Sequence, residues 1–164
     1  MSDTLIVYYS LEGNVDFVAR AVAKECGADV YQIETVKEYA KRGLAKFLHG
    51  GRDVTFGLKP ELKGNLPDLA AYSKVVLGCP VWASKPAAPM SSFLDKVDLH
   101  GKKVFVFASS AGGNAEKCID MICNSISQKG GNVEGNASFV NPAQKPEEAV
   151  KKIKAFSEKI IRTN

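Results

Sequence analysis

The chain has 164 residues, of which 45% are hydrophobic and 24% charged, and its formal net charge is +4. This length and composition predict a single domain over residues 1–164, and they exclude a disordered chain and a membrane-spanning one. Basic residues are scattered without interleaved aromatic side chains, so we expect neither a nucleic acid nor a membrane as partner. The N-terminus carries no signal segment, which leads us to expect a cytoplasmic location.

The four cysteines, Cys26, Cys79, Cys118 and Cys123, include no C-x-x-C pair. Their spacing to one another and to the two histidines is poor for chelation. We therefore expect reduced and mostly buried thiols, no disulfide framework and no metal site.

Short apolar, β-branched segments alternate with helical patterns along the chain. In chain order, we predict a strand at 4–9, a helix at 14–25, a strand at 30–34, a helix at 38–48 ended by Gly50-Gly51, a loop at 52–67, a strand at 73–79, a helix at 90–97, a strand at 103–108, a helix at 114–128, a strand at 132–139 and a helix at 146–162. This alternation predicts a doubly wound α/β domain. Its five-stranded parallel sheet has the order 2-1-3-4-5, with helices on both faces. Ligands of such sheets bind outside the carboxyl ends of the strands, so the loops after strands 1, 3 and 4 are the candidates for a site.

The loop after the first strand has the composition of an anion-binding turn. Ser10 supplies a hydroxyl, Gly13 permits a tight turn, and Asn14 is suited to cap the following helix with its side chain. The free N–H groups of the first helical turn and the helix dipole then favour an anion. The same residues fit an ordinary capped strand-to-helix turn equally well.

Two later loops have the features of a ring-binding site. The segment Gly78 to Pro86 follows the third strand and contains Trp82, the only tryptophan of the chain. The loop Ser109 to Asn114 follows the fourth strand with two hydroxyls and two glycines, which let the backbone approach a ligand closely. Ser109 is a weak candidate for a nucleophile, because no G-x-S-x-G motif and no suitably placed histidine accompany it.

Two of these loops resemble motifs of the flavodoxin family. Tyr9-Ser-Leu-Glu-Gly-Asn-Val15 resembles the phosphate-binding signature Ser/Thr-x-Thr/Glu-Gly-Asn-Thr, and Gly78-Cys-Pro-Val-Trp-Ala-Ser-Lys-Pro86 resembles the segment that lines the isoalloxazine ring. The resemblance implies a flavodoxin-like fold that binds flavin mononucleotide (FMN). It implies as cofactor-binding residues Ser10, Leu11, Glu12, Gly13, Asn14, Val15, Pro80, Val81, Trp82, Ala83, Ser84, Ser109, Ser110, Gly112 and Gly113. Val15 departs from the family threonine, so it offers the phosphate only its N–H group.

The third loop separates two functions within this resemblance. It lacks the acidic residue and the stacking tyrosine of electron-carrier flavodoxins, and it is similar to the T-x-G-G form of small bacterial flavodoxin-like oxidoreductases. We therefore expect an FMN-dependent oxidoreductase that requires no catalytic side chain. Its electron donor and acceptor are expected to be small molecules, such as NAD(P)H or a quinone, or a redox protein. The alternative is a dedicated electron-transfer flavodoxin, against which the net charge of +4 counts. Two other protein classes are disfavoured by the first strand and its loop. A receiver domain needs acidic residues at the end of this strand, and a phosphatase needs a cysteine and an arginine around its phosphate loop; this chain has none of them there.

Three further hypotheses concern neighbouring segments. The segment Lys41 to Gly51 resembles a Gly-rich stretch of the small bacterial members. It could form a wall over the flavin, with His49 or Arg42 in contact with the substrate. The alternative, which we prefer, is a helix and loop on the surface. Lys85 beside the ring is expected to raise the flavin potential, although a solvated lysine fits equally. Short edge strands and the last helix leave homodimerisation open.

Overall fold

The computed structural model of the protein describes residues 2–39 and 44–164. Its main sheet is parallel and consists of β1 (Thr4–Tyr8), β2 (Asp29–Gln32), β3 (Lys74–Trp82), β5 (Lys103–Ser110) and β6 (Asn132–Val140). These strands lie in the order β2-β1-β3-β5-β6, which confirms the predicted order 2-1-3-4-5. The element β4 (Lys85–Pro86) lies off this path and pairs antiparallel with β3.

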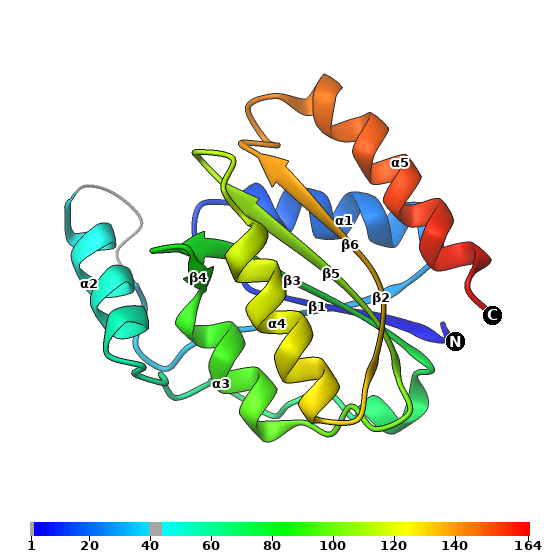
Figure 1. The fold of residues 1–164 in the computed structure, drawn as a ribbon, viewed down its shortest axis with the longest axis horizontal. Helices are drawn as coiled ribbons and strands as arrows, with labels where there is room; N and C mark the ends of the chain where they lie inside the picture. The colour runs from blue at the N-terminus through cyan, green and yellow to red at the C-terminus, as the bar shows by residue number, and fades with distance from the viewer. Residues whose placement is uncertain (1, 40–43) are drawn as a thin grey trace.

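Helices cover both faces of the sheet, as predicted (Figure 1). On one face, α1 (Asn14–Cys26) and α5 (Pro146–Arg162) bury apolar side chains against Ile6 and Tyr8 of β1. On the other face, α3 (Ala88–Lys96) and α4 (Glu116–Gln128) pack over Leu5 and Val7. Neighbouring residues of β1 therefore point to opposite layers, which explains why this strand is apolar throughout.

The boundaries of two elements differ from the prediction in ways that shape the site. The helix predicted to end at Gly50-Gly51 instead continues through both glycines as α2 (Leu44–Thr55). The predicted first part of this helix includes residues 40–43, which lie outside the described residues. The third strand continues past Cys79 to Trp82, because its end pairs with β4 in a hairpin. Trp82 thus lies on a strand rather than in a loop.

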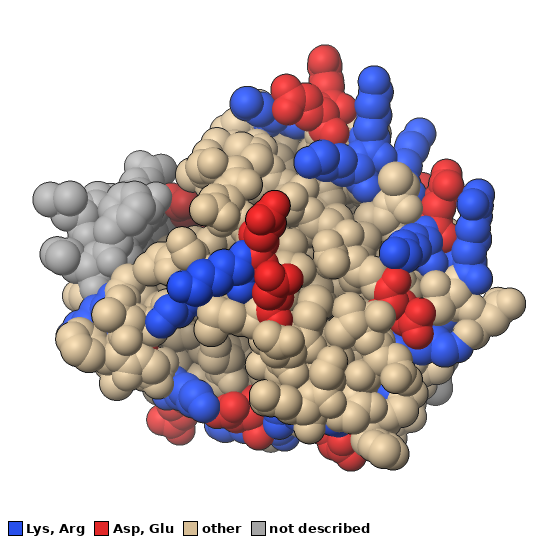
Figure 2. Space-filling view, in the orientation of Figure 1, with Lys and Arg blue, Asp and Glu red and all other residues tan. Residues whose placement is uncertain are grey.

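The remaining elements complete the frame. A short 3-10 helix, Leu69–Ala71, precedes β3. Over residues 2–39 and 44–164, no helix has both the length and the apolar character needed to cross a membrane. On the face shown in Figure 2, Lys and Arg side chains are interspersed with Asp and Glu instead of forming a patch of one sign.

Candidate functional site

A cavity of about 330 Å³ opens at the carboxyl edge of the sheet, between the loops that follow β1, β3, β5 and β6. Most of the predicted cofactor-binding residues line it; Gly13, Ser84, Gly112 and Gly113 do not. The lining also includes three residues outside the predicted cofactor-binding set, Gly51, Ala111 and Asn141. Among the described residues, the lining consists of Ser10, Leu11, Glu12, Asn14, Val15, Gly51, Pro80, Val81, Trp82, Ala83, Ser109, Ser110, Ala111 and Asn141. The structure thus brings three predicted loops to one cavity, while their role in binding stays a prediction.

The turn between β1 and α1 presents hydrogen-bond donors to the cavity. Gly13 adopts the left-handed φ of 96° and carries the helix cap, and its carbonyl accepts the N–H of Phe17 at 2.9 Å. Ser10 Oγ accepts the N–H groups of Gly13 at 3.2 Å and Asp16 at 3.1 Å. The other N–H groups of this helix end belong to Asn14 and Val15, which line the cavity. Because Ser10 Oγ already accepts two bonds, its own proton is free to donate to an anion.

The predicted capping role of Asn14 is wrong. Asn14 is the first residue of α1, and the cap position is taken by Gly13, which has no side chain that could accept a backbone N–H. The Asn14 carboxamide instead accepts the N–H of Ala143 at 3.1 Å, from the loop between β6 and α5. Its side chain therefore joins two loops that are far apart in the sequence.

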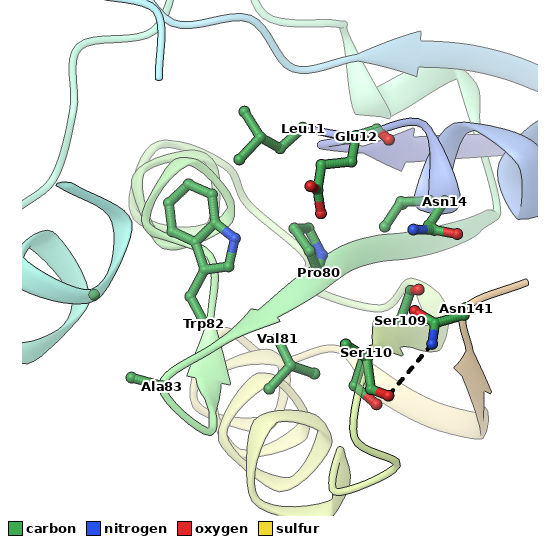
Figure 3. A pocket seen from close by; sticks show the side chains of 14 residues that line it. Leu11, Glu12, Asn14, Pro80, Val81, Trp82, Ala83, Ser109, Ser110 and Asn141 are labelled. Atoms are coloured by element: carbon green, nitrogen blue, oxygen red, sulfur yellow. Dashed lines mark hydrogen bonds between the residues drawn. The ribbon is translucent and has the colours of Figure 1, made fainter. Parts of the chain in front are cut away.

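The β3–β4 hairpin places Trp82 at the opposite end of the cavity. Trp82 pairs with Lys85, and the two residues between them, Ala83 and Ser84, have left-handed φ values of 48° and 63°. Two successive positive φ values are the mark of the tight hairpin turn whose twist matches that of the strands. In Figure 3 the indole stands away from Asn14 and Asn141, with the cavity between them. Lys85 is half-buried and is not among the lining residues, so its effect on the flavin stays a hypothesis.

Two tyrosine rings pack against Trp82. Its ring lies 5.7 Å from that of Tyr9 and 4.9 Å from that of Tyr39, at interplanar angles of 90° and 62°. These are edge-to-face contacts, the arrangement that aromatic quadrupoles favour. The indole therefore both faces the cavity and packs against the protein, which fixes its orientation.

Helix α2 is a wall of the cavity and not only a surface helix. A Cβ atom at Gly50 would lie 3.1 Å from Cε3 of Trp82, a tight contact that the indole could accept only by moving a few tenths of an ångström. Gly51, on the next position, lines the cavity. The wall hypothesis thus holds for these glycines, whereas His49 is exposed and absent from the lining, and Arg42 lies outside the described residues.

The tyrosines behind Trp82 are uncharged at neutral pH. Burial, and secondarily the charge of Glu38, raises the pKa of Tyr9. Burial also raises the pKa of Tyr39. The Tyr39 hydroxyl donates a hydrogen bond to Oδ2 of Asp53 at 2.6 Å, and this carboxylate raises the pKa of Tyr39 further. The two phenols consequently add no charge to this aromatic end of the cavity.

The loop after β5 repeats the hydrogen-bond pattern of the loop after β1. Ser110 Oγ accepts the N–H of Gly113 at 3.0 Å, and Gly113 has a left-handed φ of 81°. The carbonyl of Ser110 accepts the N–H of Asn141 at 3.1 Å, which ties this loop to the end of β6. Of the cysteines, Cys79 and Cys118 are buried, Cys26 and Cys123 are half-buried, and all four are free.

Comparison with known proteins identifies the family. Residues 3–151 match the family model described as flavodoxin. An NAD(P)H dehydrogenase (quinone) from Caulobacter vibrioides is 31% identical over 139 residues, covering 77% of this chain and 67% of the relative. One with the same name from Rhodopseudomonas palustris is 31% identical over 137 residues, covering 76% and 66%. This chain thus spans about two thirds of the length of these relatives.

Solved structures agree on the fold. A protein from Bacteroides eggerthii superposes with a TM-score of 0.80 at 21% identity over 98% of both chains. A Lactobacillus acidophilus flavoprotein in complex with FMN gives a TM-score of 0.70 at 24% identity over 88% of this chain and 96% of the other. Oxidised Flavodoxin 2 from Bacillus cereus gives 0.61 at 20% identity over 96% and 99%. With the family model matching most of its length, the chain belongs to the flavodoxin family.

Proposed function

We propose that this protein is an FMN-dependent oxidoreductase that transfers reducing equivalents from NAD(P)H to a quinone. The observation that carries the proposal is a single cavity with hydrogen-bond donors at one end and an aromatic wall at the other. FMN has the matching construction, a phosphate and a planar ring system joined by a ribityl chain. The curated relatives at 31% identity bear the name NAD(P)H dehydrogenase (quinone), which supports the reaction class.

The polar end of the cavity is suited to the phosphate. The N–H groups of Asn14 and Val15 and the Ser10 hydroxyl converge at the N-terminus of α1, where the helix dipole also favours an anion. No Lys or Arg is among the described residues that line the cavity. Among the described residues, neutral donors and the helix dipole are therefore what the cavity offers a phosphate.

The aromatic end is suited to the ring system. Trp82 offers a flat apolar surface whose orientation Tyr9 and Tyr39 fix. The bound flavin supplies the redox chemistry, and the protein supplies binding, orientation and electrostatics. Because the pKa values of Tyr9 and Tyr39 are raised, neither phenol adds a charge beside the ring at neutral pH. A planar, uncharged acceptor such as a quinone fits this environment better than a charged one.

The test is to purify the protein, remove its flavin and titrate the apoprotein with FMN while recording visible absorbance and flavin fluorescence. We expect one FMN per chain. The loaded protein is then mixed with NADH or NADPH under anaerobic conditions, followed by a benzoquinone. We expect bleaching of the flavin by the nucleotide and its return on adding the quinone.

Two other outcomes have definite meanings. An apoprotein that does not bind FMN contradicts the proposal as a whole. A loaded protein that neither nucleotide reduces, but that exchanges electrons with protein donors, contradicts the enzymatic reaction and supports the electron-carrier alternative. Heat-treated protein and free FMN at the same concentration are the controls for uncatalysed quinone reduction.

A further inference from the structure

The loop between β6 and α5 closes the polar end of the cavity, although no sequence motif pointed to it. Asn141, the first residue after β6, lines the cavity together with residues of the loops after β1 and β5. Figure 3 shows its side chain beside Ser110 and on the same side of the cavity as Asn14, away from Trp82. Asn141 therefore lies at the end where the phosphate donors converge.

The backbone of Asn141 is held in an unusual conformation. Its φ of 43° is in the left-handed region, which asparagine tolerates better than most residues other than glycine. Its N–H donates to Ser110 O at 3.1 Å, and its carbonyl accepts the N–H groups of Gln144 and Lys145, each at 3.0 Å. Three backbone hydrogen bonds thus hold the backbone of Asn141 in this conformation.

A second contact ties the same loop to the anion-binding turn. The N–H of Ala143 donates to Oδ1 of Asn14 at 3.1 Å, and Asn14 is the residue that starts α1 at the cavity. The loop after β6 is therefore joined to the other two loops at the polar end, to one by Asn141 and to the other by Ala143. Any ligand atom at the start of α1 lies within this ring of three loops.

The Asn141 carboxamide has a second N–H that can donate to a ligand. Its Nδ2 donates to the carbonyl of Ala111 at 3.4 Å, which occupies one of its two protons. A neutral donor is of particular value here, because the described lining contains no Lys or Arg and does contain the carboxylate of Glu12. A carboxylate repels a phosphate, whereas an amide N–H attracts it.

We infer that Asn141 recognises the phosphate of FMN through its side-chain amide, and that the loop after β6 is a fourth cofactor loop. This inference rests on the proposed function. It assigns to Asn141 a share in the discrimination between FMN and riboflavin, which has the same ring and ribityl chain without the phosphate. The ligand class is a phosphate monoester.

The experiment compares FMN with riboflavin on two variants. Asn141→Gly removes the carboxamide and keeps the left-handed backbone, which glycine adopts without strain. We expect its affinity for FMN to fall about tenfold and its affinity for riboflavin to stay unchanged, as for loss of one hydrogen bond to a charged group. Asn141→Asp keeps the shape but replaces a donor by an anion, so we expect a larger loss, again for FMN alone. Asn65→Asp, in an exposed loop, is the matched control for the added charge.

The outcomes separate this inference from the proposed function. Equal losses for FMN and riboflavin would show that Asn141 contacts the shared part of the flavin or only supports the loop, and would overturn the inference. Variants with wild-type affinity for FMN would overturn it as well. A wild-type apoprotein that binds no FMN contradicts the proposed function itself. Thermal melting of each apoprotein verifies that the variants are folded.

Discussion

The two ends of the cavity are built in different ways. The polar end depends on hydrogen bonds within short turns, above all those from Gly13 and Asp16 to Ser10 Oγ. The aromatic end depends on packing between segments that are distant in the sequence, where Tyr9, Tyr39 and Gly50 surround Trp82. A local motif can therefore specify the first end, whereas only the complete fold creates the second. Variants at each end are expected to affect different parts of a bound flavin.

The largest effect is expected at the polar end, from Ser10→Ala. This change removes the acceptor of two backbone N–H groups and the hydroxyl that we propose donates to the phosphate. A hydrogen bond to a charged group contributes about 1.5–3 kcal/mol, so we expect FMN affinity to fall roughly ten- to a hundredfold, as measured by titration of the apoprotein. Loss of the capping bonds should also lower the free energy of unfolding by about 1 kcal/mol.

Riboflavin provides the control for Ser10→Ala. Its affinity should change much less than that of FMN, because it lacks the phosphate. Ser10→Thr, which keeps the hydroxyl, should retain most of the FMN affinity. If Ser10→Ala weakened both flavins equally, the turn would support the cavity as a whole instead of contacting the phosphate.

At the aromatic end, Trp82→Ala should show the opposite selectivity. The proposed site places the ring system that FMN and riboflavin share against the indole, so both affinities are expected to fall together. An aromatic contact contributes about 0.5–1.5 kcal/mol beyond the area it buries, which corresponds to a loss of about tenfold in affinity for each flavin. Trp82→Phe retains an aromatic face and should lose less. A loss confined to FMN would place the phosphate, and not the ring, near Trp82.

The difference between the ends also explains what the sequence could predict. The turn proposed to bind the phosphate lies within the seven residues from Tyr9 to Val15, and local chemistry and the family resemblance were sufficient to predict that it belongs to the cavity. The strand order followed from the alternation of elements, and it is confirmed. Even so, Asn14 was assigned the wrong role, because its actual partner, Ala143, comes beside it only when β6 and α5 are in place.

The wall and the fourth loop were beyond local inference for the same reason. Gly50-Gly51 has the composition of a helix end, yet α2 continues through it, and the small size of Gly50 serves a close approach to Trp82. Asn141 follows a strand at the sheet edge, and its place in the cavity depends on the pairing of β6 with β5. An asparagine directly after a parallel strand is the one sequence signal that points toward it.

The contact between α2 and Trp82 can be tested with two neighbouring glycines. Replacing a helical glycine by alanine stabilises by about 0.5–1 kcal/mol where the new methyl group meets no obstacle. Gly51→Ala satisfies that condition, because among the described residues no atom beyond its chain neighbours and the backbone of its own helix lies within 4 Å of the added Cβ. Gly50→Ala should stabilise less or destabilise, because its Cβ would lie 3.1 Å from Cε3 of Trp82. Urea denaturation of the two apoproteins measures the difference, and equal stabilisation would show that α2 does not pack on the indole.

The smallest effect is expected from Asp53→Asn, which acts on the indole only through Tyr39. Burial raises the pKa of Tyr39 first, and the Asp53 carboxylate at 2.6 Å from its hydroxyl adds to this shift. The amide should therefore lower the Tyr39 pKa without returning it to its ordinary value near 10. In the folded protein this phenol keeps its proton at pH values where the unfolded chain has lost it, so the stability that Tyr39 contributes is complete below about pH 10 and declines as the pH rises toward the folded pKa.

Alkaline titration of tyrosinate absorbance checks this expectation. In Asp53→Asn, Tyr39 should ionise at lower pH than in the wild type. The free energy of unfolding that Tyr39 contributes should therefore decline over a narrower pH range above about pH 10. Other buried tyrosines titrate in the same region, since burial and the Asp16 hydrogen bond raise the pKa of Tyr8 to about 12. The reference is therefore Tyr39→Phe, in which Asp53→Asn should leave the titration unchanged. A shift that persists there would arise from another tyrosine, and the hydrogen bond to Asp53 would then have no part in holding the aromatic end.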